Sequence, residues 1–290
     1  MKKLILILVL SYIVVTSGFS AETSKPVTII FYHTSDLHEH SDGLPRIAKF
    51  VNDKKDEGGN ILFVDTGDWF NKGDLTPLNT RGEAIVEMMG ACKYDAVIPG
   101  NHDYTFGTKR LVELVDKYSI PLLAANCTWP KKFLPKKVLP YSIHEFEGVR
   151  IGIIGTASTI TNRASDKDLK IQPIEQSVKI FVKQLESEAD IIVLLTHTGV
   201  IADRKLITAI PRLDILFGGH DHKKFSKLEF NEKTRTVLQH SGAYGKFLGE
   251  LTITWDGEKI VDHKLRLIAV SKKMAPSRTV KAIADKYLTK

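Results

Sequence analysis

The feature that most constrains the fold is an alternation between short β-branched runs and segments with helical periodicity. Strands are predicted at 27–35, 60–66, 95–99, 121–125, 150–156, 190–196 and 214–217. Between them, the apolar spacing predicts helices at 44–55, 81–89, 108–118, 174–186 and 202–210. Strands that alternate with helices are typical of an α/β protein built on largely parallel sheets. We find no internal repeat and no low-complexity linker, so the sequence predicts one compact domain.

After residue 222 the pattern changes to strands alone, at 226–230, 235–239, 246–254 and 259–270. These strands are expected to form antiparallel hairpins, and Asp256-Gly257 is a strong turn signal between the last two. A final amphipathic helix is predicted from Pro276 to Leu288. The expected organisation is therefore a catalytic domain at 21–275 followed by a C-terminal helix at 276–290.

Polar residues cluster where predicted strands end. In chain order, the clusters are Asp36-Leu37-His38, Gly67-Asp68, Gly100-Asn101-His102-Asp103, Thr196-His197-Thr198 and Gly218-Gly219-His220-Asp221-His222. Ligands of open α/β sheets bind outside the carboxyl ends of the strands. These five clusters are therefore expected to meet in one crevice.

The residue types in these clusters suit a pair of divalent metal ions. Imidazole and carboxylate groups bind zinc, manganese or iron, and two ions about 4 Å apart can clamp a phosphoryl group for in-line displacement. Each cluster alone could be a simple turn, since Gly, Asn and Asp all favour turns. Five of them in order, each at a strand end, are hard to explain in that way. The sequence therefore predicts a metal site.

The chain has 290 residues with 41 Lys and Arg against 34 acidic residues, a formal charge of +7. The basic residues are scattered, which favours a small anionic substrate over a nucleic-acid polymer. Lys2 and Lys3 precede an apolar run from Leu4 to Val15, the pattern of a secretory signal peptide at residues 1–20. The alternative is an uncleaved anchor, but this run is shorter than the ~20 residues that span a bilayer. We expect an exported, periplasmic or secreted protein without a stable membrane anchor after cleavage.

Two cysteines in an exported chain often pair. Here, Cys92 precedes the predicted strand 95–99, and Cys127 follows the predicted strand 121–125. If these strands are parallel neighbours, the cysteines lie about 16 Å apart along the strand axis. A disulfide tolerates a Cα separation of no more than ~7 Å. We therefore predict two free thiols.

With these motifs in view, the sequence resembles the calcineurin-like metallophosphoesterases, in particular the 5′-nucleotidase type of catalytic domain. The five clusters match the family motifs in order, and the segment 239–249 (QHSGAYGKFLG) also resembles that subgroup. The resemblance covers nearly all of residues 27–270. It implies a four-layer α/β/β/α sandwich with two central sheets. It also implies ligand roles: Asp36, His38, Asp68 and His222 for one ion, and Asp68, Asn101, His197 and His220 for the other, with Asp68 bridging.

The sequence also departs from this family. The resemblance makes His102 the catalytic acid or transition-state donor, and in related proteins an Asp orients that histidine. The two positions from which such an Asp would come hold Thr105 and Asn71 here. In addition, family nucleotidases carry a C-terminal domain that holds the base, and this chain ends where that domain would begin. We therefore do not transfer nucleotide specificity to this chain.

Together these features predict a dinuclear metal-dependent phosphoesterase that hydrolyses phosphate mono- or diesters, nucleotides among them, by attack of a metal-bridging hydroxide. The oligomeric state is left open. Two alternatives remain at this stage. One is a thiosulfohydrolase of the sulfur-oxidation type, which is built on a similar domain. The other is a metal-binding accessory protein whose catalysis is weakened, an alternative that Thr105 and Asn71 keep open.

Overall fold

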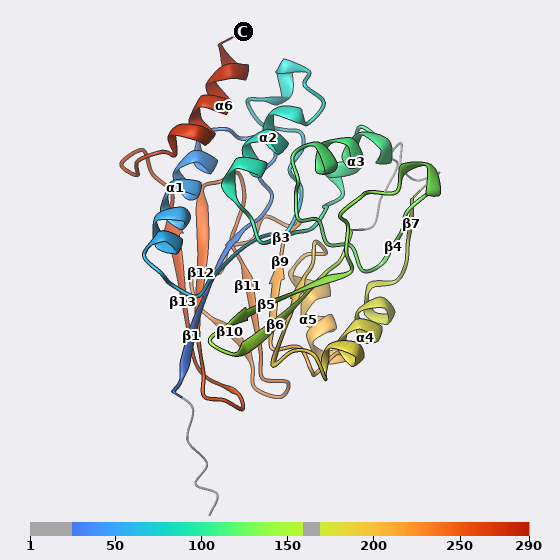
Figure 1. Ribbon diagram of the computed structural model, residues 1–290, viewed down its shortest axis with the longest axis vertical. Coiled ribbons are helices and arrows are strands. Elements are labelled where there is room, and N and C mark those ends of the chain that lie inside the picture. The colour runs from blue at the N-terminus through green and yellow to red at the C-terminus, as the bar shows by residue number, and fades with distance from the viewer. Residues whose placement is uncertain (1–24, 159–168, 290) are drawn as a thin grey trace, which may run out of the picture.

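The computed structural model of the chain describes residues 25–158 and 169–289 (Figure 1). The predicted signal peptide at residues 1–20 lies outside the described residues. The fold is built around two β-sheets, which carry helices on their outer faces, and a separate two-stranded pair, β4 (Cys127–Thr128) with β7 (Lys170–Ile171).

The first sheet has five strands in the order β13-β12-β1-β2-β3. Strand β1 lies at its centre, parallel to β2 and antiparallel to β12. The hairpin predicted around Asp256-Gly257 joins β12 to β13. The strands are β1 (Val27–Thr34), β2 (Ile61–Asp65), β3 (Ala96–Val97), β12 (Phe247–Trp255) and β13 (Ile260–Ala269).

The second sheet has six strands in the order β10-β11-β9-β8-β6-β5. Its four inner strands run parallel, and its two edge strands are antiparallel to their neighbours. The prediction of hairpins alone after residue 222 is wrong for β11, which pairs parallel with β9 as well as antiparallel with β10. The strands are β5 (Tyr141–Phe146), β6 (Val149–Gly155), β8 (Ile191–Leu195), β9 (Ile215–Gly218), β10 (Glu229–Asn231) and β11 (Thr236–His240).

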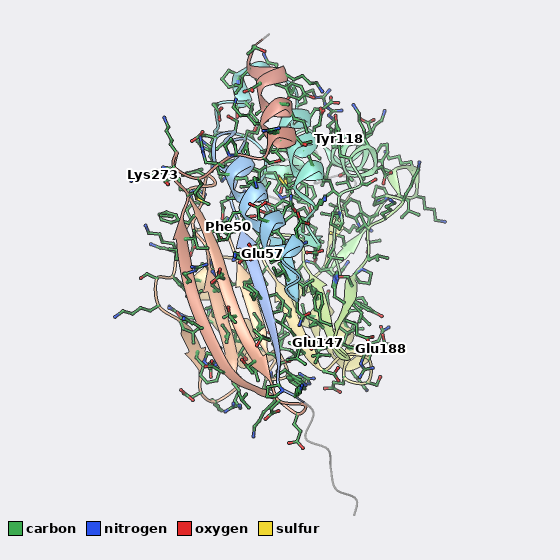
Figure 2. All side chains as sticks on the ribbon, turned by 60° about the vertical axis from the view of Figure 1, so that its left-hand side comes forward. Phe50, Glu57, Tyr118, Glu147, Glu188 and Lys273 are labelled. Atoms are coloured by element: carbon green, nitrogen blue, oxygen red, sulfur yellow. The ribbon has the colours of Figure 1, made fainter. Side chains whose placement is uncertain are left out.

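Three apolar cores separate four layers, which confirms the predicted α/β/β/α sandwich in a single domain. One core lies between the two sheets, and each of the others lies between a sheet and its helices. In β1, Phe31 faces the core between the sheets, whereas Tyr32 faces the helices and packs edge-on against Phe50 of α1, with ring centroids 5.8 Å apart. This alternation is the period of an extended strand. Figure 2 labels Phe50 on the helix side of the first sheet.

The first sheet is covered by α1 (Gly43–Asp56), α2 (Glu83–Cys92), α3 (Thr108–Lys117) and α6 (Arg278–Leu288). The second is covered by α4 (Ile174–Leu185) and α5 (Val200–Ala209). Three short 3₁₀ turns complete the elements: η1 (Thr76–Leu78), η2 (His102–Tyr104) and η3 (Lys131–Phe133). Within the described residues, no helix is both long enough and apolar enough to cross a bilayer.

The predicted strand 121–125 is wrong as a strand, although its position is right. Leu122 forms a single parallel bridge to Val97, and Leu123 forms another to Leu139. Pro121 has no N–H to donate to a ladder, and the Leu122 N–H is taken by the carbonyl of Ile120 at 2.8 Å. The segment still runs parallel to β3, as the argument about the cysteines requires. Both thiols are free in the structure, as predicted.

Candidate metal centre

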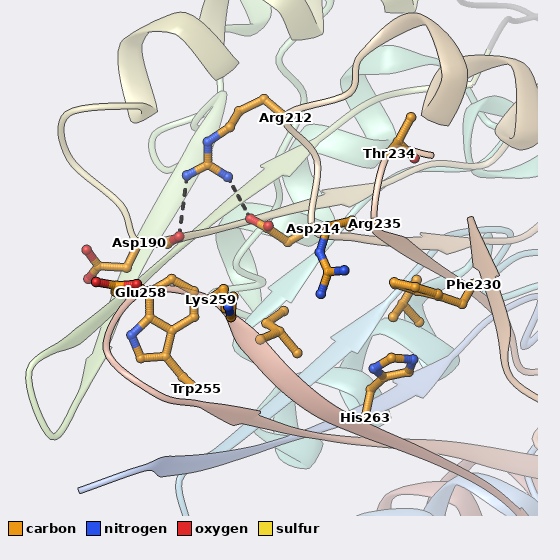
Figure 3. Close-up of a pocket in the computed structure, with 12 residues that line it drawn as sticks. Asp190, Arg212, Asp214, Phe230, Thr234, Arg235, Trp255, Glu258, Lys259 and His263 are labelled. Atoms are coloured by element: carbon orange, nitrogen blue, oxygen red, sulfur yellow. Dashed lines mark hydrogen bonds and ion pairs between the residues drawn. The ribbon is translucent and has the colours of Figure 1, made fainter. Parts of the chain in front are cut away.

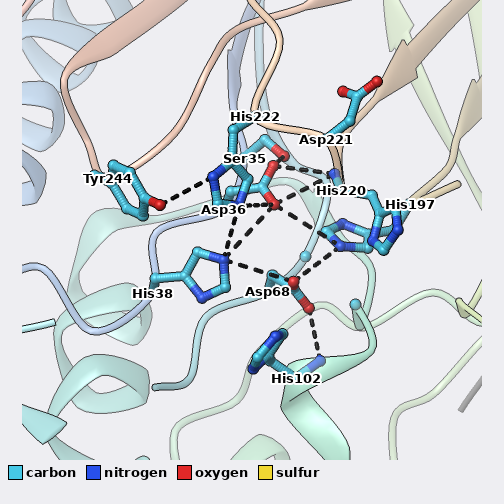
Figure 4. Close-up of polar contacts among 12 residues, drawn as sticks. Ser35, Asp36, His38, Asp68, His102, His197, His220, Asp221, His222 and Tyr244 are labelled. Atoms are coloured by element: carbon cyan, nitrogen blue, oxygen red, sulfur yellow. Dashed lines mark hydrogen bonds and ion pairs between the residues drawn. The ribbon is translucent and has the colours of Figure 1, made fainter. Parts of the chain in front are cut away.

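The structure brings the side chains of the five strand-end clusters together at one edge of the sandwich (Figure 4). Ligand atoms of Asp36, His38 and His222 lie within 4.8 Å of one another, and so do those of Asp68, His197 and His220. Asn101 joins the second group, since its Oδ1 lies 3.0 Å from His220 Nδ1. The side chains of the seven predicted ligands therefore lie around one centre. Asp68 falls in the second group, and its Oδ2 lies 3.6 Å from His38 Nε2 of the first.

In the first group, each imidazole is fixed by a partner at Nδ1. His38 Nδ1 lies 3.0 Å from the carbonyl oxygen of Phe70, which can only accept, so the proton is on Nδ1 and the lone pair is on Nε2. His222 Nδ1 lies 3.0 Å from the Tyr244 hydroxyl. The two Nε2 atoms are 3.1 Å apart. Burial lowers the pKa of His38 to about 4, which keeps its lone pair available for a cation.

In the second group, His197 is fixed in the same way. Its Nδ1 donates to the carbonyl oxygen of Thr66 at 2.5 Å, and its Nε2 lies 3.1 Å from Asp68 Oδ2. This Nε2 is buried and has no hydrogen-bond partner of good geometry. A ring nitrogen buried beside a carboxylate in this way is typical of a cation site.

The two carboxylates at the centre are both buried. Burial raises the pKa of Asp36. Burial also disfavours ionised Asp68, but the charge of the nearby His197 outweighs that effect and lowers the pKa of Asp68. In return, although burial alone would lower it, the carboxylates of Asp68 and Asp36 raise the pKa of His197 to about 9. In the absence of a metal ion, a proton on His197 thus supplies the positive charge that the carboxylates require.

The backbone at this centre is strained. Asp36, His38, Asp68, His220 and His222 have positive φ, from 49° for His38 to 91° for His220. Such φ values are uncommon for residues other than glycine and cost on the order of 1–3 kcal/mol each. Strain of this kind collects at functional sites, where surrounding contacts hold it. The surrounding contacts therefore hold the backbone of these loops in a strained conformation that brings the ligand side chains together.

His102 lies beside the two groups, with its ring 5.0 Å from the ring of His38. Asn71 and Thr105, the two residues that depart from the family pattern, both lie at this histidine. Asn71 Nδ2 is 3.3 Å from His102 Nδ1 and donates to Thr105 Oγ1 at 2.8 Å. Thr105 in turn donates to the carbonyl oxygen of His102 at 2.7 Å. An amide donor at Nδ1 makes that nitrogen an acceptor and leaves the ring proton on Nε2.

Asp103, whose orientation the sequence leaves open, anchors two loops. Its carboxylate accepts backbone N–H groups from Asp68, Trp69, Phe70 and Gly100 at 2.7–3.2 Å. These groups belong to the loops after β2 and β3. Asp103 therefore holds the loop of Asp68 against the loop of Asn101.

Sequence reasoning missed the groups that orient the histidines. The carbonyl oxygens of Phe70 and Thr66 carry no sequence signal, because every residue has one. Tyr244 had a signal, since it lies in the segment 239–249 that resembles the nucleotidase subgroup. His33 is buried behind the site, with Nε2 2.9 Å from Thr66 Oγ1, and belongs to neither ligand group.

A separate cavity of about 360 Å³ lies at the other end of the sheets, where β8 and β9 begin (Figure 3). Arg212 in its wall pairs with Asp214 at 2.8 Å and donates to the carbonyl oxygen of Asp190 at 3.3 Å. None of the predicted ligands lines it. The functional site is therefore assigned to the carboxyl ends of the strands.

Residues 29–224 match the family model of the calcineurin-like phosphoesterases. The chain belongs to this family. The match includes every predicted ligand as well as His102. The family hydrolyses phosphoric ester bonds with the help of metal ions, which is the enzyme class expected from the sequence.

Relatives within the family are distant and mostly longer. The chain is 26% identical over 266 residues to the trifunctional nucleotide phosphoesterase protein YfkN of Bacillus subtilis, which covers 79% of this chain and 18% of that protein. It is 23% identical to a 5′-nucleotidase of Diplobatis ommata, with 93% of this chain and 53% of that protein covered. The chain thus spans about half, or less, of the length of these curated relatives.

Solved structures show the same fold. The 5′-nucleotidase precursor of Thermus thermophilus matches with a TM-score of 0.79 at 22% identity, over 90% of this chain and 58% of that one. The sulfate thiohydrolase SoxB from the same genus matches with a TM-score of 0.80 at 19% identity, over 90% and 60% of the two chains. At these identities the likeness establishes the architecture alone.

Proposed function

We propose that the chain is a phosphoesterase that holds two divalent metal ions and hydrolyses small phosphate esters. The observation that carries the proposal is the pair of ligand groups that meet around two buried carboxylates. The proposed ligands are Asp36, His38, Asp68 and His222 for one ion, and Asp68, Asn101, His197 and His220 for the other.

The residues fit such ions well. His38 and His197 each donate from Nδ1 to a carbonyl oxygen, which leaves Nε2 to bind a metal. When His222 binds through Nε2, its Nδ1–H donates to the Tyr244 hydroxyl. The mixture of imidazole, carboxylate and amide oxygen suits Mn²⁺, Zn²⁺ or iron. Bound ions of this kind polarise phosphoryl oxygens, lower the pKa of water and neutralise developing charge.

The chain itself supplies a proton donor beside the ions. Asn71 keeps the ring proton of His102 on Nε2, and this N–H is proposed to hydrogen-bond the leaving-group oxygen as negative charge develops on it. Asp68 Oδ1 accepts the backbone N–H of His102 at 2.7 Å, which ties the donor to the proposed bridging carboxylate. The same hydrogen bond fixes the position of the His102 backbone relative to Asp68.

The substrate class follows from the family and the site together. Relatives are named as 5′-nucleotidases and as a nucleotide phosphoesterase, so nucleotides are one candidate among small phosphate mono- and diesters. Because the chain spans only part of those relatives, their specificity is not transferred with the fold. We further propose that residues 1–20 act as a signal peptide, that the protein works after export, and that 21–275 forms the catalytic unit, on which helix α6 of the C-terminal segment 276–290 packs.

The test is hydrolysis by metal-free protein reconstituted with Mn²⁺, Zn²⁺ or Fe²⁺. The substrates are phosphomonoesters, phosphodiesters, nucleotides and thiosulfonates. Release of phosphate that requires the metal and is lost in Asp68→Ala supports the proposal. Turnover of thiosulfonates alone would favour the thiosulfohydrolase alternative, and metal binding without turnover of any substrate would favour an accessory protein. Full activity after chelation and dialysis would refute the metal mechanism.

A further inference from the structure

Two of the ligand-bearing loops are joined directly to each other. One follows β8 and carries His197; the other follows β9 and carries His220 and His222. Gly199 N–H in the first donates to the Gly219 carbonyl oxygen in the second at 3.0 Å. The loops therefore lie side by side, and their spacing sets the distance from His197 to His220 in its own ligand group and to His222 in the other.

Asp203 fixes the first loop. It lies in the first turn of α5, is fully buried, and directs its carboxylate back toward the loop. Oδ1 accepts hydrogen bonds from Thr196 Oγ1 at 2.7 Å and from Thr198 Oγ1 at 2.6 Å. These two threonines flank His197, so one carboxylate holds the chain on both sides of that ligand.

Asp221 fixes the second loop. It lies between His220 and His222, and its Oδ2 accepts the backbone N–H of Val200 at 3.0 Å. Val200 is the first residue of α5. The carboxylate therefore ties the loop of His220 and His222 to the helix that carries Asp203.

His240 joins the two carboxylates. It ends β11, opposite Gly218 in the parallel register, and is 1% exposed. Its Nε2 lies 2.8 Å from Asp203 Oδ2, and its Nδ1 lies 3.5 Å from Asp221 Oδ1. A Cβ on Gly218 would come within 2.3 Å of His240 Nε2 and 2.2 Å of Asp203 Oδ2, so only glycine leaves room for this contact.

The charges in this array are complementary. Burial alone would lower the pKa of His240, but the hydrogen bond that it makes to Asp203 and the negative charges of Asp203 and Asp221 raise it. The charged imidazole donates from Nε2 to Asp203 and lies at ion-pair distance from Asp221. Charge-assisted hydrogen bonds between buried groups are stronger than neutral ones.

We propose that Asp203, His240 and Asp221 form a positioning array that sets the spacing of His197 relative to His220 and His222 and so determines the affinity for divalent cations. None of the three is a proposed metal ligand. The inference rests on the proposed function, because it assumes that these histidines bind metal. Groups that orient ligands in this way typically contribute 10- to 100-fold to metal affinity.

The experiment measures Mn²⁺ binding to the metal-free chain by isothermal titration calorimetry, alongside thermal unfolding of the same samples. His240→Ala is expected to weaken Mn²⁺ binding by about 10- to 100-fold. His240→Gln, which keeps a donor for Asp203, is expected to recover part of the loss. Leu206→Ala is the matched control, since Leu206 is buried in the same helix but contacts the apolar core. It should lower the melting temperature and leave the affinity unchanged.

Thr198→Val removes a single hydrogen bond to Asp203 and supplies the test if His240→Ala does not fold. It should weaken Mn²⁺ binding in the same direction by a smaller factor. Affinity within twofold of the parent chain in His240→Ala, or in Thr198→Val where the first does not fold, would overturn the inference. A loss no greater than that of Leu206→Ala would overturn it as well. Failure of the parent chain itself to bind Mn²⁺ would overturn the proposed function together with this inference.

Discussion

Asp103→Asn should destabilise the protein strongly even though the substitution is nearly isosteric. Asp103 is fully buried. One carboxylate oxygen accepts from the N–H groups of Trp69 and Phe70, and the other accepts from those of Asp68 and Gly100. All four donors lie in loops that carry proposed ligands, so the substitution perturbs both loops at once.

The size of the effect follows from the count of donors. Asparagine has one acceptor oxygen, so in either orientation of its amide two backbone N–H groups face an NH₂ group. A buried donor without a partner costs about 1–3 kcal/mol. The expected loss in the free energy of unfolding is therefore about 2–6 kcal/mol, which is a large part of the roughly 5–15 kcal/mol of a typical domain.

The assay is urea unfolding of metal-free protein followed by circular dichroism. The midpoint should fall while the slope with urea stays constant. Asp53→Asn is the matched control, because Asp53 is an exposed partner of Lys49 on α1, and its loss should stay within about 0.5 kcal/mol. A loss below about 1 kcal/mol for Asp103→Asn would refute the anchoring role. Wild-type stability combined with slow hydrolysis of poor leaving groups would instead place Asp103 in catalysis through His102.

Three further outcomes are expected. Asp68→Ala should reduce metal-dependent hydrolysis more than His222→Ala at matched Mn²⁺, because Asp68 is proposed to serve both ions, and equal losses would contradict a shared carboxylate. His102→Ala should cost less than the ~10²–10⁴-fold usual for a general acid, and more for alkyl phosphates than for nitrophenyl esters; an equal, large loss on both would count against the Asn71 interaction as its orienting contact. Burial lowers the pKa of His33 to about 3, so below pH 6.5 the unfolded chain binds a proton that the folded chain excludes. The free energy of unfolding should therefore fall by about 1.4 kcal/mol per pH unit from pH 6.5 toward 3 relative to His33→Gln, and parallel pH profiles for the two proteins would be inconsistent with this assignment.

Much of the fold could be predicted because strands buried on both faces leave a clear sequence signal. All five residues of β2 and of β8 are buried, and both strands were expected within a residue of their observed bounds. The choice of partner leaves no such signal. The run that forms β11 is compatible with a hairpin, and only the packing of the second sheet places it parallel to β9.

The centre was predictable for a related reason. The carboxyl ends of neighbouring parallel strands meet at one edge of a sheet, so the ends of β1 and β2 lie together in the first sheet and the ends of β8 and β9 lie together in the second. The packing of one sheet on the other then brings the two pairs of strand ends to one centre. Asp203 and His240 carry no comparable signal. They are 37 residues apart in the chain, one on a helix and one on a strand, and only the fold brings their side chains to 2.8 Å.

The two departures from the family pattern, Asn71 and Thr105, show an interaction that could not be predicted from the sequence. Asn71 and Thr105 stand at positions from which either of two carboxylates would orient the histidine in relatives, and in the sequence they look like two separate losses. In the structure they form one unit: the amide of Asn71 donates to both His102 and Thr105, and Thr105 returns a hydrogen bond to the backbone of His102. A carboxylate would accept from Nδ1 and favour a charged ring, whereas this amide donates to Nδ1 and favours a neutral ring with its proton on Nε2. In the proposed mechanism His102 is therefore an oriented donor without a positive charge, and a neutral ring is a weaker acid than a charged one, which is why only a modest loss is expected in His102→Ala.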